Sequence, residues 1–161
     1  MSRSERSAGS QRGGSAVEFA LVAWLLLAVI LATLDFAQLF FANLTMQHAV
    51  REGVRYAITG RTDLAPDPVG TPQDRCDAAV ARMRQAAAGW FDRMRSEVVF
   101  KTVAADGSVV TIGPGSCYAA GQILVIQLDN RAPVFTPFLR PLFADGVYEF
   151  SVSAVMKNEA Y

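Results

Sequence analysis

Few side chains in this sequence of 161 residues combine in a pattern that could carry out catalysis. His48 is the only histidine, and the chain has no Gly-x-Ser-x-Gly elbow, no phosphate-binding Walker loop and no H-E-x-x-H pair. Four acids crowd one loop and the start of the next predicted helix: Asp63, Asp67, Asp74 and Asp77. There they suit helix capping and the helix dipole better than calcium binding. Without a C-x-x-C or Cys/His cluster, a structural zinc site lacks ligands. The sequence therefore predicts no enzyme, no metal and no cofactor.

One carboxylate, Glu18, stands at the border of the most apolar run in the chain, in the stretch RGGSAVEFALVAW (residues 12–24). An acid in the middle of a membrane costs about 2.5–3.5 kcal/mol, so Glu18 is expected near a membrane surface, with a cation in reach. The alternative is that the side chain of Glu18 only extends to the edge of the membrane, with no cation as partner and no cleavage of the chain nearby.

The run that follows Glu18 is predicted to cross a membrane. Residues 19–34 carry no charge, but sixteen helical residues span only about 24 Å of a hydrocarbon core of about 30 Å. The span is therefore expected to continue through DFAQLFFANL and to cover about residues 19–42. A cleaved secretory signal is the alternative, but the apolar stretch exceeds the usual 7–15 residues or so, and no clear cleavage site follows it.

The charges that flank the span predict its orientation. Residues 1–13 contain three arginines and one glutamate, which favours a cytoplasmic amino end and places the rest of the chain outside. Thiols oxidise in that compartment, so Cys76 and Cys117 are predicted to form one disulfide, with two unrelated buried cysteines as the alternative. The formal net charge of zero gives no basic surface for nucleic acid.

Periodicity predicts an α+β domain at the end of one long helix. No proline interrupts residues 15–58, so one helix can leave the membrane and become amphipathic. A loop rich in proline and glycine follows, and then a second helix over residues 73–95 with an apolar stripe: Cys76, Val80, Met83, Ala87, Trp90 and Met94. Four segments with a period of two predict an antiparallel sheet of three to four strands, over residues 97–104, 107–112, 122–130 and 147–159. Asp106-Gly107 predicts a hairpin between the first two segments. The alternation predicts one apolar face in the third segment, with Leu124, Ile126 and Leu128, and an inward face in the fourth, with Tyr148, Phe150, Val152, Ala154 and Met156. The second helix is expected to cover the apolar face of the sheet, which gives a pilin-like fold.

The segment that joins the last two strands, APVFTPFLRPLF (residues 132–143), holds three prolines and five large apolar side chains: Phe135, Phe138, Leu139, Leu142 and Phe143. Prolines keep such a segment out of helices and central strands, so these side chains cannot all turn inward as one regular face. A contiguous exposed patch usually marks a contact, here with a partner subunit or the membrane surface. The alternative is a loop folded over the open end of the core.

The amino-terminal pattern resembles a known processing signal. Counted from Gly14 as the first residue, Glu18 is the fifth and Phe19 the sixth, and Gly13 comes directly before. This order resembles the class III signal of type IV pilin-like proteins, which a prepilin peptidase cuts after the glycine. Such a cut would free an α-amine on Gly14, one helical turn from Glu18. The resemblance implies a processing site formed by Gly13, Gly14, Glu18 and Phe19.

The whole long helix resembles that of TadE-like proteins, pseudopilins of the tight-adherence (Flp/Tad) pilus system. The Glu-Phe pair, Asp35-Phe36 and REGVRY (residues 51–56) carry the resemblance, and SVSAVMKNEAY looks like the family's closing strand. The resemblance implies a leader peptide of residues 1–13, a helix of residues 14–59 and a periplasmic or extracellular domain of residues 60–161. It also implies a minor subunit of the bacterial inner membrane that helps to initiate or assemble the pilus.

The partners implied are the prepilin peptidase, other pseudopilins, the major Flp-type pilin, the inner-membrane assembly platform and the membrane itself. A membrane-anchored periplasmic binding or sensing module is the main alternative, because a helix can serve as an anchor alone. A tethered hydrolase is a third interpretation with less support.

Overall fold

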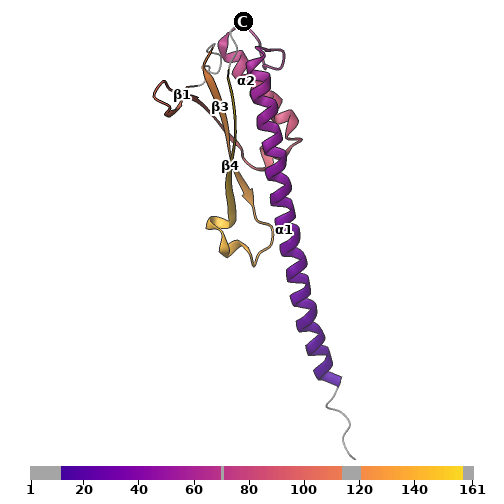
Figure 1. Ribbon diagram of the computed structural model, residues 1–161. Coiled ribbons are helices and arrows are strands. Elements are labelled where there is room, and N and C mark those ends of the chain that lie inside the picture. Colours follow the sequence, from indigo (N-terminus) through magenta and orange to yellow (C-terminus); the bar gives the residue numbers. More distant parts are fainter. Residues whose placement is uncertain (1–11, 70, 114–120, 158–161) are drawn as a thin grey trace, which may run out of the picture.

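The computed structural model describes residues 12–69, 71–113 and 121–157, and these form one long helix with a small α+β domain around its carboxyl-terminal half (Figure 1). The elements, in chain order, are α1 (Arg12–Ile58), α2 (Pro72–Ala86), α3 (Trp90–Arg93), β1 (Glu97–Val103), β2 (Val109–Thr111), β3 (Ile123–Pro133) and β4 (Val147–Lys157). Two short 3-10 turns, Arg140–Leu142 and Ala144–Gly146, lie between β3 and β4. The long helix, the α+β class and the antiparallel sheet predicted from the sequence are confirmed.

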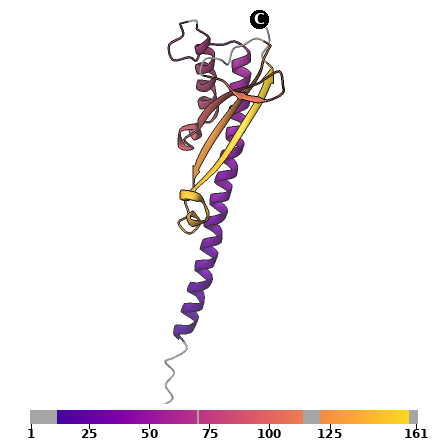
Figure 2. The same ribbon diagram turned by 90° about the vertical axis from the view of Figure 1, so that its left-hand side faces the viewer.

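Helix α1 is one uninterrupted rod of 47 residues, which corresponds to about 70 Å at the usual rise. No proline lies within it to remove a backbone donor. Its amino-terminal half extends beyond the domain in both views (Figures 1 and 2). From Asp35 onward, one face of the helix turns toward the domain, and this face carries Leu39, Ala42, Met46 and Ala49. The helix is thus exposed in its first half and part of the core in its second.

The four strands form a single antiparallel sheet in the order β2-β1-β3-β4. Strands β1 and β2 form the predicted hairpin, in which Gly107 takes a positive φ of 83° that suits glycine in a tight turn. Leu124, Ile126 and Leu128 of β3 alternate inward as predicted and join the core. On β4 the inward set is also as predicted: Tyr148, Phe150, Val152, Ala154 and Met156.

The helix that covers the sheet is not the one expected. Helix α1 packs against β3 and β4, and α2 packs against α1. Figure 2 shows α2 beside α1 and away from β4. The elements that pack on α1 lie close to it because its core face carries small residues at Ala42, Ala49 and Ala57, all fully buried. The prediction that residues 73–95 lie over the sheet was therefore wrong, since the emerging half of α1 takes that place.

The second helix is also shorter than predicted. Helix α2 ends at Ala86, and α3 begins at Trp90, because Ala88 and Gly89 take positive φ angles of 48° and 84°. This left-handed turn breaks the run of residues 73–95. The predicted apolar stripe still packs in the core on both sides of the break. At the other end, Thr71 is the N-cap, and its backbone N–H donates to Asp74 at 2.8 Å.

Candidate functional site

The residues of the predicted processing site lie in the first two turns of α1. Gly13 and Gly14 have helical backbone, and a Cβ atom added to Gly14 would meet nothing within 4 Å. Glu18 follows Gly14 by four residues, so both lie on one side of the helix. The carboxylate of Glu18 is exposed, and among the described residues no ion pair involves it. Phe19 is exposed as well. The site is accessible and leaves the charge of Glu18 for a partner outside the described chain.

The first half of α1 exposes apolar side chains on all sides. Between Val17 and Leu34 nearly every large residue is an exposed leucine, isoleucine, valine or aromatic side chain. Among the described residues, α1 is the only helix that is long and apolar enough to cross a membrane, and its most apolar window has no buried residue. Since such a surface is not expected in water, α1 fits a single-pass membrane anchor.

The contacts between α1 and the domain extend toward the amino end of α1 as far as Asp35. The carboxylate of Asp35 accepts a hydrogen bond of 2.9 Å from the backbone N–H of Thr136, in the segment between β3 and β4. Both residues are buried, with 7% and 5% of their surfaces exposed. A buried carboxylate needs such a donor, because removal from water without one is unfavourable. This contact joins two segments 101 residues apart, and no sequence pattern marked Thr136 as the partner.

The five apolar residues of that segment divide into two groups. Phe135, Phe138 and Leu142 are exposed, whereas Leu139 and Phe143 are half-buried, with Phe143 in an edge contact with Tyr148.

The start of the segment differs from expectation, because Ala132 and Pro133 are the last residues of β3. Pro133 is tolerated there because β1 no longer pairs with β3 beyond Asp129, so that edge of the strand needs no proline N–H.

The REGVRY motif holds the domain onto α1. Glu52 accepts a hydrogen bond of 2.9 Å from Arg82 of α2, and this bond is the main reason why the pKa of Glu52 is lowered. Gly53 lies directly against α2, where an added Cβ atom would be 2.2 Å from Cγ of Met83. Only glycine fits at this crossing without a shift of Met83. The motif is therefore a contact between helices rather than a catalytic set.

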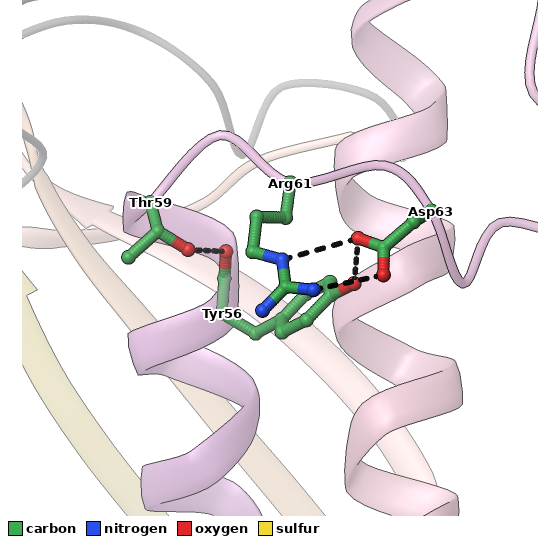
Figure 3. A network of polar contacts seen from close by, with 4 residues as sticks. All are labelled: Tyr56, Thr59, Arg61 and Asp63. Carbon is green, nitrogen blue, oxygen red and sulfur yellow. Dashed lines mark hydrogen bonds and ion pairs between the residues drawn. The ribbon is translucent and has the colours of Figure 1, made fainter.

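Tyr56 continues this contact into the loop after α1 (Figure 3). Its hydroxyl donates a hydrogen bond to Asp63, and Arg61 donates two more to the same carboxylate, at 3.0 and 3.2 Å. Burial, followed by the bond to Asp63, raises the pKa of Tyr56, and the bonds from Tyr56 and Arg61 lower the pKa of Asp63. An open groove of about 470 Å³ runs beside this network, but Glu52 and Asp63 within it pair with its arginines. Among the described residues that line the groove, neither acid is therefore unpaired.

The remaining candidate residues are the cysteines and His48. Cys76 is buried in the core on α2, and Cys117 lies outside the described residues, so their pairing stays a prediction. His48 is exposed on α1. Within the described ranges, no three His, Cys, Asp or Glu side chains gather in a way that could hold a metal ion.

Two of these contacts were missed by reasoning from the sequence. From the sequence, Asp35 was named as part of the Asp35-Phe36 pair and Gly53 as part of REGVRY, but neither residue was given a contact. Their residue types could have indicated these contacts. A buried acid in an apolar helix needs a hydrogen-bond donor, and a glycine within a helix often marks a close neighbour.

Comparisons with known proteins agree with the amino-terminal pattern. The model of the family described as TadE-like protein matches residues 13–55. The match begins at Gly13, includes Glu18, Asp35 and Gly53, and ends within REGVRY, so it covers most of α1 and none of the later elements. A comparison with curated proteins gives no match, and a comparison with solved structures gives none either. The resemblance to TadE-like proteins is confirmed, and it rests on α1.

Proposed function

We propose that this chain, which matches the model of the TadE-like family over residues 13–55, is a pseudopilin of the tight-adherence pilus system that takes part in the initiation or assembly of the pilus. A prepilin peptidase cuts it after Gly13, and the mature helix stays in the inner membrane with Gly14 on the cytoplasmic side. The domain of residues 60–161 faces the periplasm or the exterior. Its partners are other pseudopilins, the major Flp-type pilin and the inner-membrane assembly platform.

The observation that carries this proposal is the exposed carboxylate of Glu18, which forms no ion pair with any described residue, at the start of an apolar helix that matches the family. A helix that serves only as a membrane anchor gains nothing from an acid at this position, because burial of the charge in lipid is unfavourable. In a subunit that moves from the membrane into a filament, the acid can form an ion pair. The carboxylate then pairs with a newly freed α-amine, on its own Gly14 or on a neighbouring subunit.

The arrangement of the domain supports the same role. The contacts of Glu52, Gly53 and Tyr56 fix the domain on the carboxyl-terminal half of α1, and within the described part of the chain the amino-terminal half is exposed on every side. A free apolar rod can lie in lipid before assembly and pack against other rods afterwards. The domain need not change shape between these two states.

Replacement of Glu18 by glutamine tests the proposal. In cells whose only copy is Glu18→Gln, we expect the protein to reach the membrane at the normal level but surface pili, counted by electron microscopy, to be lost. Glutamine keeps the size of the side chain and removes the charge that the freed amine needs. The matched control is Glu149→Gln, which removes an exposed acid from β4, and it should leave pili unchanged.

Normal piliation in the Glu18→Gln cells would contradict the proposal. It would show that α1 serves as an anchor, as expected of a membrane-tethered binding or sensing module.

A further inference from the structure

The segment between β3 and β4 has a fixed place beside the membrane-crossing part of α1. Asp35 is the first residue of α1 on its domain-facing side, and its bond to the N–H of Thr136 sets the level of this segment along the helix. In both views the segment lies at the end of the sheet nearest the exposed half of α1 (Figures 1 and 2). No charged residue lies between Glu18 and Asp35.

The β3–β4 loop, defined as residues 134–146, holds its own shape. The N–H of Val134 donates to the carbonyl of Gly146 and closes the loop at 3.1 Å. Inside it, the carbonyl of Thr136 accepts from the N–H groups of Leu139 and Arg140, and Nε of Arg140 donates back to the carbonyl of Val134. Because these bonds fix the backbone, the outward side chains cannot simply fold back into the core.

Three of those outward side chains are large and apolar. Phe135, Phe138 and Leu142 expose 52%, 42% and 74% of their surfaces. Large apolar side chains that are exposed together on one short loop usually mark a contact with a partner or a membrane. The exposed apolar residues of α1 end just before Asp35, the residue to which Thr136 of the loop is bonded.

The length of α1 relates its exposed half to the thickness of a membrane. If the hydrocarbon core begins at the level of Gly14, one turn before Glu18, residues 14–34 span about 32 Å and cross its thickness of about 30 Å. Asp35 and Thr136 then lie at the outer boundary of the hydrocarbon core. If the span continued to residue 42, as the sequence analysis expected, Asp35 and the polar backbone of the β3–β4 loop would lie inside the hydrocarbon, where irregular backbone exposed to lipid is not tolerated.

We propose that the β3–β4 loop inserts Phe135, Phe138 and Leu142 into the interfacial layer on the outer face of the membrane that α1 crosses. The loop rests at the level where apolar and aromatic side chains are commonly found in membrane proteins. Its charged residues, Arg140 and Asp145, are exposed and balance each other, so apolar insertion rather than attraction to anionic lipid drives the contact. The membrane contact fixes the tilt of the domain above the bilayer. This inference needs only that α1 crosses a membrane and does not depend on the pilus role.

Quenching by brominated lipids tests this placement on the full chain. The protein carries Trp24→Phe and Trp90→Phe, so that a single tryptophan can be added as a reporter, and it is reconstituted in vesicles of phosphatidylcholine with or without bromine near the top of the acyl chains. The first reporter is Leu142→Trp. The matched control is Val69→Trp, which is 78% exposed in the loop that follows the far end of α1. Circular dichroism verifies that each variant folds.

We expect the tryptophan at position 142 to lose most of its fluorescence to brominated lipid and the one at position 69 to lose almost none. Equal fluorescence of the first reporter in both kinds of vesicle would overturn the proposal. Equal quenching of both reporters would also overturn it, because the whole domain would then lie on the membrane. A blue shift at position 142 that grows with protein density, without quenching, would overturn it in favour of contact with a second copy.

Discussion

Replacement of Gly53 by leucine is expected to lower the free energy of unfolding of the domain by about 3 kcal/mol, at the upper end of the usual cost of overpacking. A Cβ atom at this position would lie 2.2 Å from Cγ of Met83 and 3.3 Å from the carbonyl oxygen of Ala79. Met83 is fully buried, so its side chain has nowhere to move without displacing other core residues. Urea unfolding of the full chain in detergent micelles, followed by near-ultraviolet circular dichroism, measures the change.

The matched control for Gly53 is Arg51→Leu, which places the same side chain two residues earlier on the exposed side of α1. Its unfolding midpoint should stay within about 0.5 kcal/mol of the unsubstituted protein. If Gly53→Leu unfolds at the same urea concentration as this control, α1 and α2 do not cross as closely as the structure places them.

Reduction of the predicted Cys76–Cys117 bond is expected to lower the stability of the domain by about 4 kcal/mol, because the bond would close a loop of roughly forty residues. Cys76 is almost fully buried on α2. The measurement is urea unfolding with and without a phosphine reductant. Reduced protein and the Cys117→Ala variant, which lacks the bond, should unfold at the same midpoint, well below that of oxidised protein.

The pairing would be disproved by two thiols that react with an alkylating reagent in the absence of reductant, in protein that has been exported normally. Denaturant in the alkylation buffer exposes Cys76, so that burial alone does not prevent its reaction.

Much of the fold could be predicted because each local signal was strong by itself. The absence of proline over residues 15–58 predicted one long helix, and alternation in β3 and β4 predicted which side chains face the core. The Asp106-Gly107 pair predicted the hairpin of β1 and β2. These features depend on backbone propensities and on a period of two, which are local properties of the chain.

The parts that could not be predicted depend on contacts between distant segments. A helix with an apolar stripe at residues 76–94 can pack on a sheet or on another helix equally well. Its packing on α1 could therefore not be predicted from the sequence. The break between α2 and α3 at Ala88 could not be predicted either, since alanine rarely takes a positive φ and favours helix. At the candidate sites the sequence identified Glu18 and the exposed aromatic residues, but it could not reveal that Asp35 binds Thr136.

The central claim, that the chain is a processed pseudopilin, is tested most directly by the intact mass of the mature protein purified from membranes of cells that contain the prepilin peptidase. The account predicts the loss of residues 1–13 and a first residue of Gly14. In the Gly13→Leu variant, which blocks the cut, the full-length mass should persist. A mature protein that retains Met1 or Ser2 at its amino end, or one that begins beyond Ala42, would contradict the account.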